Sequence, residues 1–395
     1  MNKFLLFFLF ATSLLACKTK EKEPISLTIN NSKGVQALNM PIVIKPESVK
    51  GLPKSFTITA DGKALPYQVD DFDKDGKWDE IFLIANFKAN ESKTLTFNKV
   101  EKKPTYPSKT AVTFAEKKPP HHSCYNALRV KSTDSLKASE LYQMEGPAWE
   151  NDVVGFRNYF DQRNAMDIYG KQVPDLSLAK AGINGQNYHE LDKWGMDILH
   201  VGTSLGAGAI AIKKGEKIYR IAEPEKSSFE LVANGPLRTI FNLNHQNFKI
   251  DDHEYQINHQ IAIYAGVPFY ESTVTVKGLQ GGEELVTGIV NLHSDTLYTQ
   301  TDDNQRLVFA TLDKQAEKDT YLGMAIAVDK KDFVQTIELP DEGADITSSY
   351  AVILKLEENT PVSFRFYALW ENRFKKVSNK KYFLEYLLQP DSFKL

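Results

Sequence analysis

The sequence predicts an all-β protein made of antiparallel sheets, with a small N-terminal β-sandwich followed by a large second domain. Short β-branched runs separated by Gly, Pro and Asp turns fill the chain from Pro24 to about Asn98. Beyond Leu199, strand-like runs follow one another without amphipathic helices between them. Because parallel strands need long, usually helical crossovers, this succession favours antiparallel pairing.

Residues 26–100 are expected to form the N-terminal sandwich, since the runs SLTI, IVIK, FTIT, EIFLIANF and TLTF lie close together. Residues 101–120 open with three charged residues and then carry four prolines, a composition typical of a linker. The second domain is therefore expected to span residues 121–395.

The second domain contains about ten strand-like runs. They are Ala209–Ile212, Lys217–Ile221, Leu237–Asn244, Tyr255–Tyr264, Tyr270–Val276, Val286–Leu292, Leu307–Leu312, Tyr321–Val328, Tyr350–Leu356 and Val362–Tyr367. Helical character is confined to Asp175–Ala181, part of Leu191–Leu199, and Lys380–Leu388. This many antiparallel strands fits a β-supersandwich of the galactose-mutarotase-like type. That fold hosts lyases and epimerases alike, so it does not choose a reaction.

Residues 1–16 have the features of a lipoprotein signal peptide. Lys3 supplies a positive charge, Phe4–Phe10 form an apolar core too short to span a membrane, and a small residue precedes Cys17. Cleavage would leave Cys17 as a lipid anchor carrying acyl chains such as palmitate, followed by a polar tether over residues 17–25. We therefore expect an outer-membrane lipoprotein, on the periplasmic face or the cell surface. The alternative is an ordinary secretory signal with a coincidental cysteine.

Composition narrows the classes of partner and of stabilising bond. The net charge of −3 is too small to indicate nucleic-acid binding. With Cys17 lipidated, Cys124 is the only other cysteine, so no intramolecular disulfide is expected. A hydrophobic content of 42% is sufficient for one large core or two, and stability is expected to come from burial.

An acidic segment in the N-terminal domain suggests a calcium site. Its carboxylates alternate along the chain and surround Gly76 at a sharp turn, as a hard cation with several oxygen ligands requires. The four candidate ligands are Asp71, Asp73, Asp75 and Asp79. The pattern departs from an EF-hand at its twelfth position, where Phe82 stands in place of Glu. A solvated hairpin turn is the alternative, and calcium, if bound, is expected to be structural.

The stretch from Glu145 to Lys171 is the densest in polar and aromatic residues. With the period of a strand, Val154, Phe156 and Phe160 point to one face. Arg157, Tyr159 and Asp161 point to the other face, and Arg163 joins them if the strand continues that far. Such a polar face is costly to bury unless its groups are paired or bind a ligand, so this stretch is predicted to form a functional site.

Within this stretch the arginines suit an anionic substrate, because a guanidinium group matches a carboxylate in two hydrogen bonds. Arg157 and Arg163 are the candidates, with Asn151 as an additional substrate contact. Trp149, and Trp194 further along, can stack on a sugar ring, although Trp is also a common core residue. The acids Glu145, Glu150 and Asp152 are interpreted as partners of nearby arginines in preference to a glycosidase carboxylate pair.

The histidines show no zinc-finger or metalloprotease spacing. His259 lies in register with the apolar positions of its strand and is expected in the core. His189 differs, because it follows Tyr188 in a loop rich in Gly and Asn and precedes the sequence WGMD that ends at Asp197. The glycine-rich segment 202–208 precedes no predicted helix and is interpreted as a strand connection, not a phosphate loop.

Several motifs together resemble a family of lipoproteins or secreted proteins of bacterial polysaccharide-utilisation systems, long described as a domain of unknown function. They are PYQVDDFDKDGKWDE, EGPAWENDVVGFRNYFD, DIYGK, YHELDKWGMDIL and VGTSLGAG, between Pro66 and Gly208. The resemblance implies an oligosaccharide dehydratase of ulvan breakdown, which removes water from a non-reducing-end uronic acid and leaves a 4,5-unsaturated residue.

Elimination of the 4-hydroxyl across C4–C5 of a uronate requires a cation at the carboxylate, a base at C5 and an acid at the departing oxygen. Arg157 and Arg163 suit the first task, and His189 with Tyr159 or Tyr188 suits the other two. Asp167 or Asp197 can orient the histidine. The chemistry needs no organic cofactor. A non-catalytic glycan-binding lipoprotein and a polysaccharide lyase acting on uronic-acid glycans are the alternatives.

Overall fold

The computed structural model describes residues 24–388 except 33, 35, 126–127, 131–137, 303–304 and 344. The predicted signal peptide, the lipid-anchor residue Cys17 and most of the tether lie outside the described residues. Among the described helices, none combines the length and the apolar character needed to cross a membrane.

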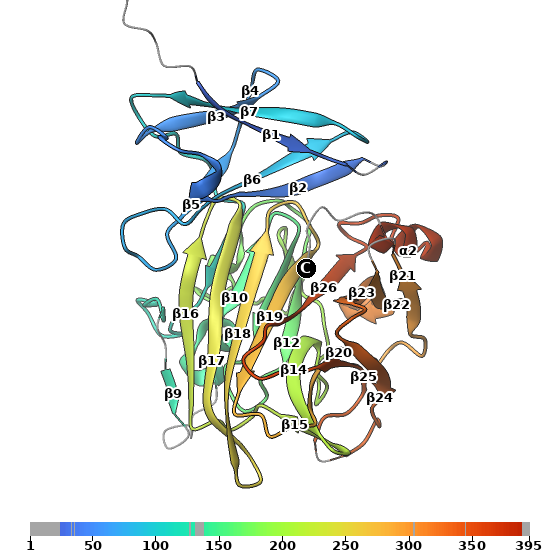
Figure 1. The fold of residues 1–395 in the computed structure, drawn as a ribbon. Helices are drawn as coiled ribbons and strands as arrows, with labels where there is room; N and C mark the ends of the chain where they lie inside the picture. The colour runs from blue at the N-terminus through green and yellow to red at the C-terminus, as the bar shows by residue number, and fades with distance from the viewer. Residues whose placement is uncertain are drawn as a thin grey trace, which may run out of the picture.

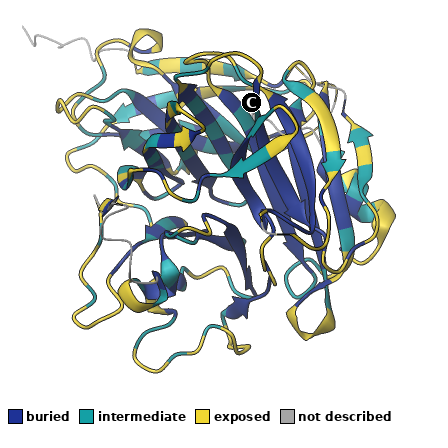
Figure 2. Cartoon of the chain, turned by 90° about the horizontal axis from the view of Figure 1, so that it is seen from below, coloured by how far each residue is buried: buried dark blue, intermediate teal, exposed yellow. Residues whose placement is uncertain are grey.

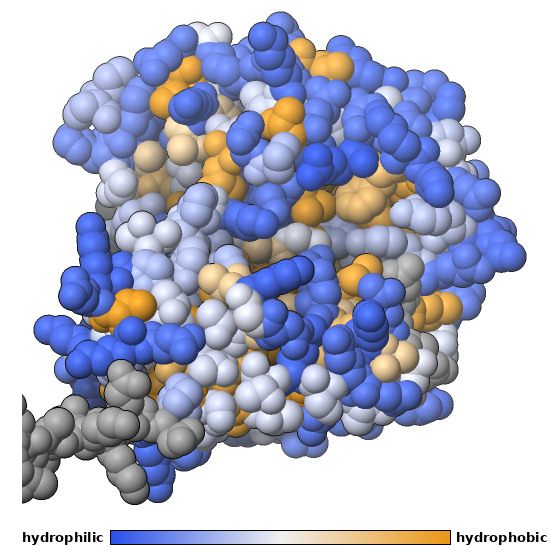
Figure 3. Space-filling view, turned by 90° about the horizontal axis from the view of Figure 1, so that it is seen from above, coloured by the Kyte–Doolittle hydropathy of each residue, from blue (hydrophilic) through white to orange (hydrophobic). Residues whose placement is uncertain are grey.

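The N-terminal unit consists of two small antiparallel sheets packed face to face at the top of Figure 1. One sheet has the strand order β1-β7-β3-β4 and the other β2-β6-β5. The bounds are β1 Ile25–Asn30, β2 Ala37–Ile44, β3 Phe56–Ala60, β4 Lys63–Leu65, β5 Tyr67–Asp70, β6 Glu80–Phe87 and β7 Ser92–Lys99. Alternate apolar residues such as Ile58, Leu83 and Leu95 are fully buried between the sheets. The outer face is largely hydrophilic, with scattered hydrophobic residues (Figure 3).

Buried Arg238 of the second domain joins the two units. Its guanidinium donates to Asp70 at the end of β5, with a shortest N–O distance of 2.6 Å, and to Glu80 at the start of β6. It also lies 4.5 Å from the centroid of the Phe82 ring. Because both acids and the arginine are almost inaccessible to water, this contact fixes the sandwich on the larger domain.

The linker prediction for residues 101–120 is wrong in its second half. Residues Thr110–Thr113 form strand β8, which pairs with β10 of the second domain. The prolines of this segment favoured a linker, although it also contains TAVT, in which Thr110 and Val112 alternate into the interior.

The second domain is built from three antiparallel sheets around a large hydrophobic core with two smaller clusters beside it, which confirms the predicted all-β supersandwich. The orders are β21-β22-β23-β26-β19-β18-β17-β16-β9, β15-β14-β20-β25-β24 and β13-β12-β11-β10-β8. Figure 2 shows the central strands largely buried, whereas several outer strands and most connecting loops are partly or fully exposed. Strand bounds are β9 Leu128–Val130, β10 Ala148–Asn151, β11 Val154–Asn158, β12 Met166–Lys171, β13 Gly195–Asp197, β14 Ala207–Lys214, β15 Lys217–Arg220, β16 Lys226–Asn234, β17 Arg238–Ile250, β18 His253–Tyr264, β19 Phe269–Lys277, β20 Glu283–Val290, β21 Tyr298–Thr301, β22 Arg306–Ala316, β23 Thr320–Asp329, β24 Phe333–Glu338, β25 Ser349–Lys355 and β26 Val362–Trp370.

Described helices are few and short. They are α1 Ala138–Leu141 and α2 Lys380–Leu388, with the 3₁₀ turns Pro46–Ser48, Gln143–Glu145, Leu178–Lys180 and Glu317–Asp319. The prediction of a helix at Lys380–Leu388 is confirmed. Asp175–Ala181 yields only one 3₁₀ turn, and Leu191–Leu199 instead contains strand β13, because Gly195 to Asp197 pair with β12.

Candidate active site

The strands β11, β12 and β13 bring the polar residues of the Glu145–Lys171 stretch together. Arg157 on β11 lies directly opposite Asp167 on β12, and Tyr169 lies opposite Asp197 on β13. Because side chains alternate along a strand, these four residues share one face of the sheet. The apolar residues between them, such as Phe156, face the core. The predicted two-faced strand is therefore confirmed for Val154–Asn158, whereas Asp161 and Arg163 lie in the turn that follows it. The polar face collects groups from three strands.

Arg157 is the centre of this cluster and is only 2% exposed. Its Nε and Nη2 donate to Asp167 Oδ2 at 3.1 and 2.6 Å, and Nη2 donates to Asp197 Oδ2 at 2.9 Å. Nη1 donates to the hydroxyls of Tyr169 and Tyr188, both at 3.2 Å. Because its donors are occupied by carboxylates and hydroxyls of the protein, Arg157 cannot bind a substrate carboxylate. The expectation that it does so is wrong, and its role is to position its neighbours.

The tyrosines around Arg157 differ in what their hydroxyl protons can do. The Tyr159 hydroxyl donates to Asp167 Oδ2 at 2.8 Å, so its proton is committed. The Tyr188 hydroxyl accepts from Arg157, and among the described residues it has no acceptor for its own proton. Burial raises the pKa of Tyr188 above its usual value of 10.0. Tyr188 is therefore a protonated phenol that can give its hydrogen to a bound molecule.

His189 is the exposed titratable group of the cluster. Its side chain is 60% exposed, and its Nδ1 lies 3.4 Å from Asp197 Oδ2. Partial burial and then the charge of Arg157 lower the pKa of His189 below 6.5, so the imidazole is neutral at pH 7. Burial and the neighbouring Asp167 carboxylate raise the pKa of Asp197 well above its usual range. The site thus offers an accessible neutral base beside a phenol.

A second group of charges borders the cluster at the surface. The Arg163 guanidinium lies over the Tyr159 ring, 4.0 Å from its centroid, and pairs with Glu145 and Asp161. Glu145 is held toward Arg163 by a left-handed backbone, with φ of 64°. A Cβ added to Gly146 would lie 2.2 Å from the carbonyl oxygen of Asn158, so only glycine fits after Glu145. Arg163 is 45% exposed and, in the described part of the chain, has no partner for Nη1.

Two of the predicted substrate contacts are wrong, and a third packs against Tyr169 of the cluster. Trp149 is fully buried among core rings, 5.3 Å from the centroids of Phe241 and Tyr270, because its alternation points to the core face. Asn151 is also buried, and its amide donates to the carbonyls of Tyr264 and Val267. Trp194 is half-buried and packs against Tyr169, with ring centroids 6.1 Å apart.

The remaining acids of the opening stretch have structural roles. Glu150 pairs with fully buried Lys171 and accepts hydrogen bonds from the backbone of Ser177 and Leu178, which anchors the loop that carries His189. Asp152 accepts from the backbone of Gly266. The interpretation of these acids as ion-pair partners holds for Glu145 with Arg163, whereas Glu150 pairs with a lysine. His259 is buried in the core, as expected.

Two contributors to the site were not predicted. Tyr169 stands two residues after Asp167, so the same alternation that identified Arg157 could have found it. Glu317 lies in the turn between β22 and β23, and its charge acts on both His189 and Asp197. Its backbone nitrogen donates to the carbonyl of Ile198. No local pattern links a turn so distant in sequence to this sheet.

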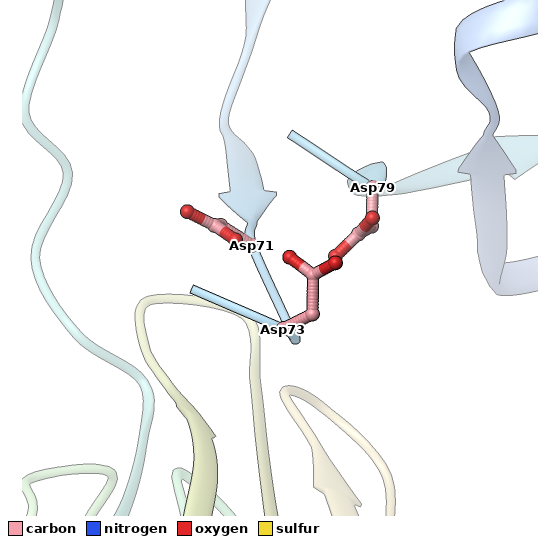
Figure 4. A group of neighbouring side chains, drawn as sticks. All are labelled: Asp71, Asp73 and Asp79. Atoms are coloured by element: carbon pink, nitrogen blue, oxygen red, sulfur yellow. The ribbon is translucent and has the colours of Figure 1, made fainter. Parts of the chain in front are cut away.

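The acidic segment brings three of its four candidate ligands together. Oxygens of Asp71, Asp73 and Asp79 lie within 4.8 Å of one another, and Figure 4 shows the carboxylates of Asp73 and Asp79 approaching each other. Asp75 is not part of this group, because its carboxylate pairs with Lys77 at 2.9 Å. The prediction of Asp75 as a ligand is therefore wrong, and oxygen ligands at the other three positions suit a hard cation.

Two hollows have residues of segment 200–203 in their walls. The smaller has a volume of about 260 Å³ and is lined by His200, His293 and the turn around Glu317. The larger has a volume of about 940 Å³, with Gly202 and Thr203 in its wall and Arg163 at its border with the polar cluster. Only the larger volume falls within the range of about 300–1,000 Å³ that is typical of ligand pockets.

The family model described as a domain of unknown function (DUF4861) matches residues 29–391. The chain belongs to this family. It is also 22% identical to Uncharacterized protein P7 of Formosa agariphila, an alignment that covers 97% of this chain and 95% of that protein. The resemblance on sequence motifs is thus confirmed for the family of unknown function, whose span includes both structural units.

Three solved structures are similar to this chain at low TM-scores. A protein in glycosyl hydrolase family 38 from Enterococcus faecalis has a TM-score of 0.47 at 8% identity over 93% of this chain. An α-mannosidase from Enterococcus faecalis V583 has a TM-score of 0.47 at 9% identity over 90%. The chain spans less than half of these two proteins, 46% and 44%. A putative aldose 1-epimerase from Klebsiella pneumoniae has a TM-score of 0.30 at 9% identity, covering 72% of this chain and 97% of that one.

Proposed function

We propose that the protein is a dehydratase that eliminates water from the non-reducing-end uronic acid of ulvan-type oligosaccharides. The observation that carries this proposal is an accessible neutral imidazole, His189, beside a protonated phenol, Tyr188. Both side chains contact the buried cluster around Arg157. A paired acid and base of this kind is what a proton-transfer elimination requires. The motif resemblance to an oligosaccharide dehydratase supports the same reaction.

In the proposed step, His189 takes the proton at C5 of the uronyl ring. The electrons of the C5–H bond form the C4–C5 double bond, and the C4–O bond breaks. The departing hydroxide takes the proton of Tyr188 and leaves as water, so the oligosaccharide loses one water and keeps its length. The proton on the imidazolium then returns to the phenolate, which restores the site without an oxidant or a reductant.

The buried cluster sets the two protonation states. Arg157 donates to the Tyr188 oxygen and thereby stabilises the phenolate formed when that proton leaves. Asp197 Oδ2 lies 3.4 Å from Nδ1 of His189 and orients the imidazole during the step. Since Arg157 and Asp197 are themselves held by buried hydrogen bonds, neither has to reorganise during the reaction.

Recognition of the uronate carboxylate is assigned to Arg163. Its Nη1 is available at the surface, and its guanidinium is held in place by Asp161 and by the Tyr159 ring. A cation at this carboxylate withdraws charge from C5 and makes its proton more acidic. The neighbouring Glu145 keeps the arginine from turning into solvent.

The test is incubation of the mature protein with saturated glucuronyl- or iduronyl-rhamnose-3-sulfate oligosaccharides. We expect a rise in ultraviolet absorbance from the conjugated product and a mass decrease of one water. A polysaccharide lyase would shorten the chain instead, and a non-catalytic glycan-binding lipoprotein would bind without product. Absence of both changes with a bound substrate would refute the proposal for that substrate.

We also propose that the protein acts at the outer membrane, tethered through Cys17. A lipidated N-terminal cysteine would hold the enzyme where polysaccharide fragments arrive. Metabolic labelling with a clickable palmitate analogue should mark the wild-type chain and leave Cys17→Ser unlabelled, while Cys124→Ser stays labelled. Equal labelling of wild type and Cys17→Ser would contradict the anchor.

A further inference from the structure

The large cleft beside the polar cluster contains a cation without an acidic partner. Arg220, at the end of β15, donates Nη1 to the backbone carbonyl of Arg163 at 2.7 Å. Its Nη2 donates to the carbonyls of Thr203 and Ser204. Neither contact involves a carboxylate. Arg220 is therefore held firmly while its positive charge is left uncompensated by any ion pair among the described residues.

Three other arginines in the same molecule differ from Arg220 in their partners. Arg157, Arg163 and Arg238 each contact two carboxylates directly. Arg220 is half-buried, and burial lowers its pKa, which is the sign of a guanidinium that lacks a compensating anion. A partly desolvated cation of this kind gains most from an anionic ligand that supplies the missing charge.

The rest of the cleft suits a sugar chain. Tyr219, Phe248 and Ile346 provide an apolar and aromatic lining, on which the carbon faces of sugars can pack. Lys217 and Lys249 add positive charge at the rim. Three acids also line the cleft, namely Glu216, Glu223 and Asp345. Glu223 accepts from Gln162, and Asp345 acts on Arg220 only at a distance.

The position of the cleft relates it to the proposed reaction. Arg163 belongs both to the cleft wall and to the cluster around Tyr159. Arg220 in turn holds the backbone of Arg163. A substrate whose reacting carboxylate lies at Arg163 can therefore continue along the cleft past Arg220. At about 940 Å³ the cleft is at the upper end of the range for ligand pockets and exceeds what one ring needs.

We propose that this cleft binds the part of an oligosaccharide that lies beyond the reacting ring, with an anionic substituent of that part, a sulfate or a carboxylate, at the Arg220 guanidinium. This inference rests on the proposed function for the reacting ring, and adds a charged subsite that selects longer, anionic chains over short ones.

The test compares two substrates on three variants. The substrates are a disaccharide whose second sugar is neutral and a hexasaccharide of the sulfated uronate polymer. The variants are Arg220→Gln, the exposed Lys217→Glu, and Lys63→Ala on the N-terminal sandwich as the matched control. Since a hydrogen bond to a charged group contributes about 1.5–3 kcal/mol, Arg220→Gln should raise KM for the hexasaccharide by about ten- to a hundredfold. Lys217→Glu should raise it by less and leave KM for the disaccharide unchanged. Because Arg220 also holds the backbone of Arg163, Arg220→Gln should raise KM for the disaccharide as well, but by a smaller factor than for the hexasaccharide.

Chemically modified hexasaccharides distinguish the two anions. If desulfation removes the advantage of the longer substrate in wild type, the group at Arg220 is a sulfate, and if carboxyl reduction of the inner uronates removes it, the group is a carboxylate. Equal KM values for both substrates in wild type, or equal increases for both in Arg220→Gln and Lys217→Glu, would overturn the inference.

Calorimetric titration keeps this result separate from the dehydratase proposal. Hexasaccharide binding that weakens in Arg220→Gln and Lys217→Glu supports the subsite even if no water is lost. Water loss from both substrates with identical hexasaccharide affinity in wild type, Arg220→Gln and Lys217→Glu overturns the subsite and leaves the dehydratase in place.

Discussion

Arg157 and Arg163 provide an internal comparison of buried and exposed ion pairs. Both contact two carboxylates, yet the Arg157 side chain is 2% exposed and that of Arg163 is 45% exposed. We consider Arg157→Met and Arg163→Met, which remove the charge and keep much of the side-chain length. The first change leaves Asp167 and Asp197 buried without their cation. The second leaves its two acids in contact with water.

The expected costs differ severalfold. At an effective dielectric constant of about 20, charges about 4 Å apart attract by about 4 kcal/mol. Breaking a buried pair by removing one partner costs about 3–5 kcal/mol, whereas an exposed pair contributes about 0–1 kcal/mol. Arg157→Met should therefore lower the free energy of unfolding by about 3–5 kcal/mol, and Arg163→Met by about 1 kcal/mol or less.

Urea unfolding followed by tryptophan fluorescence measures both, because Trp149 lies in the core under the same sheet. The cost of Arg157→Met should shrink as pH falls from 8 to 5, since protonation neutralises Asp197, whose pKa is already raised by burial and by the Asp167 carboxylate. In wild type, the raised pKa of Asp197 means that the folded state binds its proton more tightly than the unfolded chain. The tighter binding of the Asp197 proton in the folded state therefore makes the free energy of unfolding decrease as pH rises above about 4.

Costs for Arg157→Met and Arg163→Met that agree within about 1 kcal/mol at pH 8 would refute this reasoning. If Arg157→Met does not fold, Arg157→Lys tests the same point, because it keeps the charge and loses the forked geometry. Its cost should fall between those of the two Met variants, with Arg163→Lys as the control near zero.

Three further predictions concern the site and the acidic segment. His189→Ala should lower kcat by about 10²–10⁴-fold with an unchanged melting temperature, while His122→Ala keeps full turnover; full turnover by His189→Ala would remove it from the mechanism. In wild type, kcat/KM should decrease on the acid side as His189 gains a proton, with a pKa below 6.5. On the alkaline side it should decrease only above pH 10, where Tyr188 loses its proton. An acid-side decrease that persists unchanged in His189→Ala would contradict this assignment. Calcium should raise the melting temperature of wild type and of Asp75→Asn but not of Asp73→Asn, and a chelator should reverse it; equal responses of the two variants would argue against a site at Asp73.

The polar face of the site could be predicted from the sequence, because the alternation of side chains is a local property of one strand. The period-two pattern through Arg157 and Tyr159 predicted their common face, and the loop composition around His189 marked it as accessible. The same local rule predicted the all-β fold and the final helix Lys380–Leu388, because each depends on residues a few positions apart.

The ion-pair and hydrogen-bond partners of each side chain could not be predicted from the sequence, because they depend on which strands lie side by side. A guanidinium has the same chemistry whether it binds a substrate or two buried carboxylates, and only the pairing of β11 with β12 and β13 commits Arg157 to Asp167 and Asp197. The sequence by itself determined the residue types at the site and the face they occupy. The tertiary structure decided which of them remain free to meet a ligand: Arg163 and His189 at the surface, while Arg157 is enclosed.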